Sequence, residues 1–169
     1  EYARLAAQHP SRFAGIAAHP LHDPRRAVEE LERAVKVRGL RGAGFISNVE
    51  GVYLDDQRFW PLYEAAQALG VPIVIHPAGP AGRDKMREYE LVNFVGFPLD
   101  TTLTAARMIF GGVLERFPRL RVLLYHGGGQ IPYILGRWDH GYRARPAARA
   151  AIPRPPSAYL PAFAFDTIV

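Results

Sequence analysis

The chain has 169 residues, of which 49% are apolar and 22% charged, and these shares are ordinary for one soluble globular domain. It contains no cysteine, so disulfide bonds and thiolate ligands are excluded and any bound metal must use nitrogen and oxygen ligands. The net charge of +5 comes mainly from scattered arginines, which argues against nucleic-acid binding and suits a small anionic substrate. Since no segment resembles a membrane span or a targeting signal, we expect a cytoplasmic protein.

The first predicted elements are a strand over residues 12–18 and a helix directly after it. Asp23 is a typical helix-capping residue, and Pro24 suits the first helical position, so the helix should begin there and run to about Arg38. Apolar residues recur along this segment at spacings of three and four, which predicts one buried face.

A strand, a loop and a second helix come next. The strand is predicted over residues 39–46 and the loop over residues 48–53. The helix should begin at Asp55 or Asp56 and end at Gly70, a residue type common just after helices.

Two later strands point most directly at a reaction. Residues 71–76 and 120–126 are apolar runs too continuous to alternate, which is typical of strands buried in a parallel sheet. The first ends at His76 and the second at His126, and loop residues follow each histidine at once. Because α/β barrels hold their chemistry at the carboxyl ends of strands, these two histidines could converge on one metal or one substrate.

The remaining elements complete an alternating pattern. They are an irregular stretch over 77–90, a helix over about 100–117, a helix through Ile134 and Trp138, a loop over 143–156 and a strand over 162–166. Alternation of about five strands with helices predicts an α/β fold with a parallel sheet. A closed eight-stranded barrel needs roughly 200 residues or more, so we expect residues 1–169 to form one domain that is the central part of a longer barrel.

Six segments in a consistent order together resemble one protein family. These segments span nearly the whole chain and cover residues 9–13, 71–77, 93–98, 111–118, 126–129 and 165–169. On these residues the chain resembles the amidohydrolase-related (amidohydrolase 2) family, which includes aminocarboxymuconate-semialdehyde decarboxylase and γ-resorcylate decarboxylase. The resemblance implies a metal-dependent (β/α)8 TIM-type barrel that binds a divalent ion, with Zn²⁺ expected first and Mn²⁺ as the other candidate.

The same resemblance implies roles for three residues. His76 resembles a metal ligand at the end of the fifth barrel strand, and His126 resembles the catalytic histidine at the end of the sixth. Arg137 aligns with an arginine that binds a substrate carboxylate from a neighbouring subunit, which implies a homodimer or a higher homo-oligomer. The family's first-strand His-x-His pair and last-strand Asp would lie outside residues 1–169, so this piece alone should bind metal poorly and be inactive.

Two functions remain open at this point. The first is a metal-dependent hydrolase or non-oxidative decarboxylase that uses metal-activated water and a catalytic histidine on a small carboxylated substrate, such as an aromatic acid. The alternative is a non-catalytic or degenerate barrel piece that acts through association, in which His76 and His126 are structural and Arg137 is an ordinary surface residue. His19 also ends a predicted strand, but it falls outside the family pattern and is expected to be structural.

Overall fold

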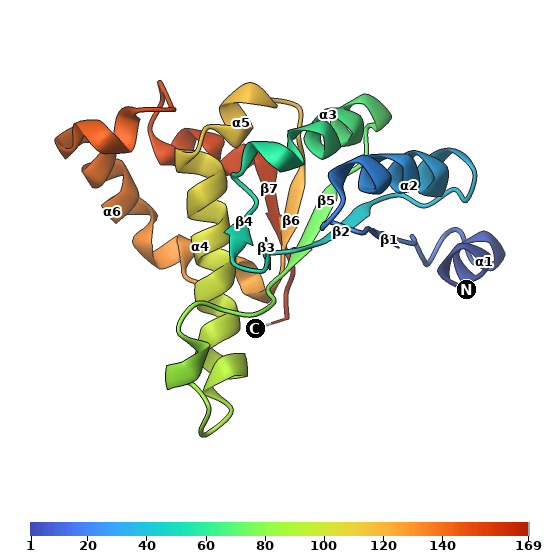
Figure 1. Cartoon of the computed structure of the whole chain (residues 1–169), viewed down its shortest axis with the longest axis horizontal. Helices are drawn as coiled ribbons and strands as arrows, with labels where there is room; N and C mark the ends of the chain where they lie inside the picture. Colours follow the sequence, from blue (N-terminus) through green and yellow to red (C-terminus); the bar gives the residue numbers. More distant parts are fainter. Residues whose placement is uncertain (169) are drawn as a thin grey trace.

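A computed structural model describes residues 1–168, and Val169, the last residue of the matched segment 165–169, lies outside them. Five strands form one sheet in the order β1-β2-β5-β6-β7, and every neighbouring pair is parallel (Figure 1). Their bounds are β1 Ala17–Ala18, β2 Ala43–Ile46, β5 Ile73–His76, β6 Val122–Leu124 and β7 Phe163–Phe165. The predicted five-stranded parallel α/β sheet is confirmed.

Helices connect these strands. Their bounds are α1 Tyr2–Gln8, α2 Pro24–Lys36, α3 Trp60–Leu69, α4 Phe97–Phe110, α5 Val113–Arg116 and α6 Ile131–Ala144. The first predicted cap is confirmed, because the Asp23 side chain accepts a hydrogen bond from the Arg26 N–H and Pro24 is the first residue of α2. Within residues 1–168, no helix is both long and apolar enough to cross a membrane.

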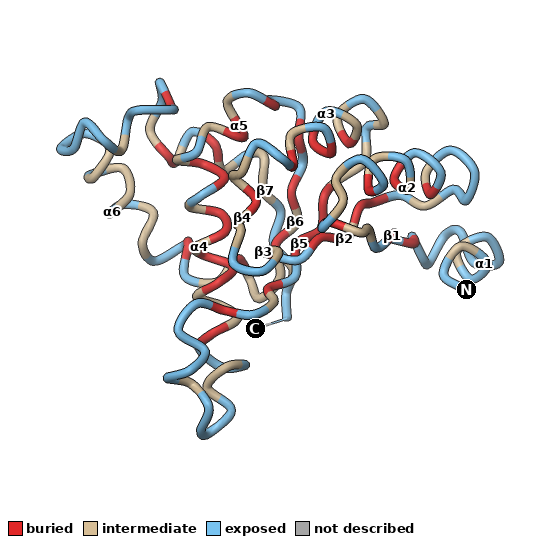
Figure 2. The backbone as a smooth tube through the Cα atoms, in the orientation of Figure 1, coloured by how far each residue is buried: buried red, intermediate tan, exposed pale blue. Residues whose placement is uncertain are grey.

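The hydrophobic core lies between one face of the sheet and the helices α2, α3 and α4. Alternate strand residues such as Ala43, Phe45 and Ile75 are buried in one apolar cluster with side chains of those helices. Their neighbours point to the opposite face, where Ile46 is 42% exposed and its register partner His76 is also exposed. Figure 2 shows buried residues in the strands, whereas α1 is largely exposed. The histidine of β5 therefore lies on the face away from the core.

The predicted loop over residues 48–53 is wrong. This segment is an antiparallel hairpin of two short strands, β3 Asn48–Val49 and β4 Val52–Tyr53. Glu50 and Gly51 form its turn with φ angles of 52° and 82°. Two successive positive φ angles are characteristic of the tightest hairpin turn.

The predicted single helix over residues 100–117 is also wrong. A turn of π-helix over Val92–Gly96 leads into α4, which begins at Phe97 and ends at Phe110, and α5 is a separate short helix. Gly112 separates the two helices with a φ of 76°, a left-handed conformation that a regular right-handed helix cannot contain.

Three connections differ in detail from the prediction. Of the two predicted starting residues, Asp56 is the one that caps, and it caps a 3-10 turn over Gln57–Phe59, after which α3 begins at Trp60. The predicted irregular stretch over 77–90 contains one 3-10 turn, Arg83–Lys85, and it projects away from the sheet (Figure 1). The predicted loop over 143–156 contains another 3-10 turn, Pro146–Arg149.

A hydrogen bond joins the hairpin to α4. The Tyr53 hydroxyl donates to Oδ1 of Asp100, which is 1% exposed, and the other carboxylate oxygen has no hydrogen-bond partner among residues 1–168. Burial and the Asp100 charge raise the pKa of Tyr53 well above its usual range, so the hydroxyl keeps its proton and remains a donor. The hairpin that follows β2 is thereby attached to the first turn of α4.

We expect Tyr53→Phe to lower the free energy of unfolding by about 1–3 kcal/mol, because a buried carboxylate then loses a donor. Urea unfolding of the wild type and the variant measures the difference. Tyr133→Phe is the matched control, since Tyr133 is 89% exposed and its hydroxyl should contribute almost nothing. Equal losses in the two variants would contradict a stabilising role for the Tyr53–Asp100 contact.

Candidate functional site

His76 and His126 lie side by side at the carboxyl ends of two neighbouring strands. His76 is the last residue of β5, and His126 lies two residues after the end of β6. The centroids of their rings are 5.4 Å apart. The structure therefore brings together the two histidines that the sequence analysis selected, on the face of the sheet away from the core.

The hydrogen bond of His76 indicates which tautomer its neutral ring adopts. Nδ1 lies 2.8 Å from the carbonyl oxygen of Pro77, which can only accept. In the neutral ring Nδ1 therefore carries the proton, and Nε2 holds the lone pair that a metal ion would use. His76 as a whole is an exposed residue.

Phe97 contacts both histidine rings. It stacks on His126 with a centroid separation of 6.0 Å and an interplanar angle of 17°, and its ring meets His76 edge-on at 5.7 Å. Tyr125 packs against His76 from the β6 side at 5.0 Å. Since Phe97 is the first residue of α4, the start of this helix lies beside both imidazoles.

The segment after His76 is held by the end of β2. The Ala78 N–H donates to Ser47 Oγ at 2.9 Å, and Asn48 Nδ2 donates to the Ala78 carbonyl oxygen at 2.7 Å. The Ser47 N–H donates to the His76 carbonyl oxygen at 3.1 Å. Because Ser47 and Asn48 are both buried, these bonds are shielded from water and hold the end of β5 in place.

The environment of His126 favours the neutral imidazole. Burial lowers the pKa of His126, the neighbouring His76 lowers it further, and the carboxylate of Asp166 acts in the opposite direction. Its Nδ1 is buried and meets no hydrogen-bond partner in the part of the chain that the structure describes. A histidine with a lowered pKa is, once protonated, a stronger acid than histidine in water, which suits proton transfer.

Asp166 is a third polar residue near the two histidines and was not among the predicted site residues. Its Oδ1 accepts a hydrogen bond from the Gly127 N–H at 2.9 Å, directly beside His126. The signal was present, because Asp166 follows its apolar strand just as the two histidines follow theirs. Polar residues thus lie at or just after the carboxyl ends of three neighbouring strands, β5, β6 and β7.

Arg137 lies apart from this group. It is an exposed residue in the middle of α6, on the wall of a groove of about 470 Å³ that Phe110 and Trp138 also line. Its α6 neighbour Asp139 accepts a hydrogen bond from the Ser157 N–H. The groove that Arg137 lines includes neither His76 nor His126.

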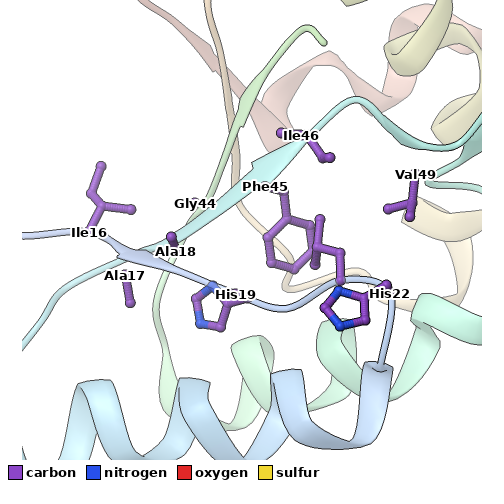
Figure 3. Close-up of a pocket in the computed structure, with 10 residues that line it drawn as sticks. Ile16, Ala17, Ala18, His19, His22, Gly44, Phe45, Ile46 and Val49 are labelled. Carbon is purple, nitrogen blue, oxygen red and sulfur yellow. The ribbon is translucent and has the colours of Figure 1, made fainter. Parts of the chain in front are cut away.

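His19 occupies the other face of the sheet. Its ring meets Phe45, a core residue, edge-on at 5.9 Å, and both ring nitrogens are buried without a hydrogen-bond partner among residues 1–168. Burial lowers its pKa. Figure 3 shows His19 and Phe45 together among the residues that line a cavity of about 420 Å³ at β1 and β2. Since His76 lies on the opposite face, this geometry supports a structural role for His19.

The residues present fit only one part of a metal site. His76 offers a free Nε2, but residues 1–168 hold no group of three or more His, Cys, Asp or Glu side chains close enough to bind one ion. Stable binding of a divalent ion needs several converging ligands. His76 is therefore suited to be one ligand of a set that this part of the chain does not complete.

Comparison with known proteins identifies the family. The Amidohydrolase (Amidohydro_2) family model matches residues 1–167. The chain belongs to the amidohydrolase family. This amidohydrolase chain is 39% identical over 168 residues to the 2-amino-3-carboxymuconate-6-semialdehyde decarboxylase of Dictyostelium discoideum. The aligned region covers 99% of the chain and 47% of the relative. It is also 37% identical over 149 residues to the γ-resorcylate decarboxylase of Polaromonas sp., and this aligned region covers 82% of the chain and 45% of the relative.

Solved structures confirm the amidohydrolase fold. The 5-carboxyvanillate decarboxylase of Sphingomonas paucimobilis matches 97% of this chain with a TM-score of 0.88 and 34% identity, over 51% of its own length. A dihydroxybenzoic acid decarboxylase of Polaromonas sp., solved with bound manganese and 2-nitroresorcinol, matches 96% of the chain with a TM-score of 0.84 and 30% identity, over 53% of its length. The amidohydrolase chain thus spans about half the length of these relatives and corresponds to about half of their TIM-type barrel.

Proposed function

We propose that the full-length protein that carries this chain is a metal-dependent, non-oxidative decarboxylase of a small aromatic or unsaturated carboxylate. One observation carries the proposal: His76 and His126 lie with ring centroids 5.4 Å apart at the carboxyl ends of adjacent parallel strands. The decarboxylase names of the relatives favour C–C cleavage over the hydrolysis that the sequence left open.

His126 is the group we assign to proton transfer. In the overall reaction a proton reaches the carbon that bears the carboxylate, the bond from this carbon to the carboxylate breaks, and CO2 leaves. A ring nitrogen of the imidazole can hold this proton and deliver it to the substrate. Burial, which lowers its pKa, strengthens the imidazolium as a proton donor, and the Phe97 ring stacks on it.

His76 is the residue we assign to a divalent ion, through Nε2. When bound there, such an ion stabilises negative charge on the oxygens of the substrate. Manganese in the dihydroxybenzoic acid decarboxylase structure makes Mn²⁺ the first ion to test, with the initially expected Zn²⁺ second. The relatives are about twice as long as this chain, and we propose that the remaining ligands come from barrel segments outside residues 1–169.

Arg137 is assigned to the substrate carboxylate of a neighbouring subunit, which makes the active protein at least a homodimer. In the full-length protein we expect Arg137→Lys to raise KM for acidic substrates about 10- to 100-fold, because lysine cannot copy a bidentate guanidinium–carboxylate contact and one charge-assisted hydrogen bond contributes about 1.5–3 kcal/mol. Steady-state kinetics measures this change, with Arg25→Lys as the control at an exposed arginine of α2. An unchanged KM for Arg137→Lys would make this arginine an ordinary surface residue.

The experiment that tests the function is a CO2-release assay on the purified full-length protein, with Mn²⁺ or Zn²⁺ added. The probes are γ-resorcylate, 5-carboxyvanillate and 2-amino-3-carboxymuconate-6-semialdehyde, the compounds in the names of the relatives. We expect release of CO2 from at least one of them, dependent on the added ion. A protein that binds metal stoichiometrically and releases no CO2 from any probe would contradict the proposal, and one that binds no metal would favour the non-catalytic alternative.

A further inference from the structure

Asp166 connects the end of β7 to the turn that carries His126. Its backbone N–H donates to the Leu124 carbonyl oxygen at 3.1 Å and so extends the β6–β7 pairing by one bond. Its side chain then reaches the next segment of the neighbouring strand, where Oδ1 accepts the Gly127 N–H at 2.9 Å. The residue therefore bonds to the chain on both sides of His126.

The turn that Asp166 contacts has an unusual backbone. Four successive residues, His126 to Gly129, have φ angles of 59°, 58°, 78° and 65°. Glycine adopts such angles freely, but a side chain with a Cβ atom pays about 1 kcal/mol or more for the left-handed region. His126 keeps this conformation because the surrounding contacts enforce it.

Those contacts come from two directions. On one side, Gly128 lies so close to Phe165 that a Cβ atom on the glycine would be 2.5 Å from the ring. On the other side, the Gln130 N–H donates to Thr102 Oγ1 of α4 at 2.8 Å. The Asp166 carboxylate supplies the side-chain hydrogen bond nearest to His126, at the residue that directly follows it.

We propose that Asp166 is a positioning residue of the candidate site: by accepting the Gly127 N–H it holds the left-handed turn that sets the His126 ring beside the His76 ring. The expected effect on catalysis rests on the proposed function. The positioning itself is argued from the hydrogen bond alone. Only Oδ1 of the carboxylate accepts the Gly127 N–H, since Oδ2 is buried and has no hydrogen-bond partner within residues 1–168.

Two substitutions of Asp166 separate its role as a hydrogen-bond acceptor from the effect of its negative charge. Asp166→Asn keeps an oxygen that can accept the Gly127 N–H and removes the negative charge, whereas Asp166→Ala removes both. If positioning is the role, the asparagine variant should resemble the wild type and the alanine variant should not.

The control is a matched bond at the other end of β6. Gln67 Oε1 accepts the Arg119 N–H at 2.8 Å, in the loop that leads into this strand. Gln67→Ala therefore also removes one side-chain oxygen from a backbone N–H beside β6, but at the amino end, away from the histidines.

The test uses the four full-length proteins: wild type, Asp166→Asn, Asp166→Ala and Gln67→Ala. Amide hydrogen exchange at Gly127 reports the hydrogen bond directly, and kcat and KM are measured with the probe that the wild type turns over. We expect Asp166→Ala to accelerate exchange at Gly127 and to lower kcat roughly 10- to 100-fold with KM changed less than threefold, because a small displacement of a catalytic group has effects of that size. Asp166→Asn and Gln67→Ala should stay within threefold of the wild-type kcat, and metal content should be equal in all four.

Three results would overturn the proposal. They are unchanged exchange and kcat in Asp166→Ala, a loss of kcat in Asp166→Asn as large as in Asp166→Ala, and a loss of bound metal in either Asp166 variant. The second would assign the effect to the carboxylate charge and the third to metal binding. A wild type that turns over no probe contradicts the proposed function instead, and the exchange of Gly127 still decides whether Asp166 holds the turn.

Discussion

Replacement of His126 by alanine is expected to lower kcat of the full-length protein by about 100- to 10,000-fold, the range typical of a lost general acid or base. The bound metal should remain near the wild-type content, because this ring is assigned to the proton and the lone pair of His76 Nε2 to the ion. Steady-state CO2 release and elemental analysis on the same preparation measure both quantities.

The control is a His→Ala change at a histidine outside the candidate site, so that the general effect of losing an imidazole can be subtracted. His9→Ala serves this purpose, since His9 is an exposed residue directly after α1. Figure 1 shows α1 beyond β1, away from β5 and β6. It should leave both kcat and metal content unchanged. Full activity in His126→Ala would remove this histidine from the mechanism.

His76→Ala is expected to lower metal content and activity together. Loss of a residue that only orients a metal ligand typically costs 10- to 100-fold in affinity or activity, so loss of a ligand itself should exceed that range. Elemental analysis after dialysis against a fixed concentration of Mn²⁺ gives the loss of ion. Activity is measured over a range of added Mn²⁺, because excess ion should restore part of it.

The pair of histidine variants also tests the division of roles. His76→Ala should respond to added Mn²⁺, whereas His126→Ala should not, because its metal site is intact. A His76→Ala protein that keeps its full complement of metal would show that this histidine is not a ligand. If both variants responded alike to added ion, the separate assignments of metal and proton would be wrong.

The strands were predictable because their signal is local. A continuous apolar run such as residues 71–76 has no face to expose, and burial in a parallel sheet is its simplest solution. The hairpin over 48–53 was missed because its turn is Glu50-Gly51, whereas the strong hairpin signals are Asn-Gly and Asp-Gly. The break between α4 and α5 was missed because apolar periodicity continues through Gly112 and hides the change in backbone conformation.

The candidate site was also predictable in part. His76 and His126 follow from the rule that functional residues gather at the carboxyl ends of parallel strands. The contacts of Phe97 did not follow, because they depend on where α4 begins and how it meets two strands distant in sequence. Asp166 was missed for another reason: a single acidic residue after a short strand is common, and only its bond to Gly127 distinguishes it.

The left-handed backbone at His126 limits which inactive variants will preserve the site. Asparagine tolerates a φ near 59° better than most non-glycine residues, whereas a β-branched residue there is strongly disfavoured. Asparagine also lacks an imidazole, so His126→Asn should stop proton transfer with less disturbance of the turn than valine or threonine would cause. For capturing an unreacted carboxylate in a crystal, this is the inactive protein we would prepare.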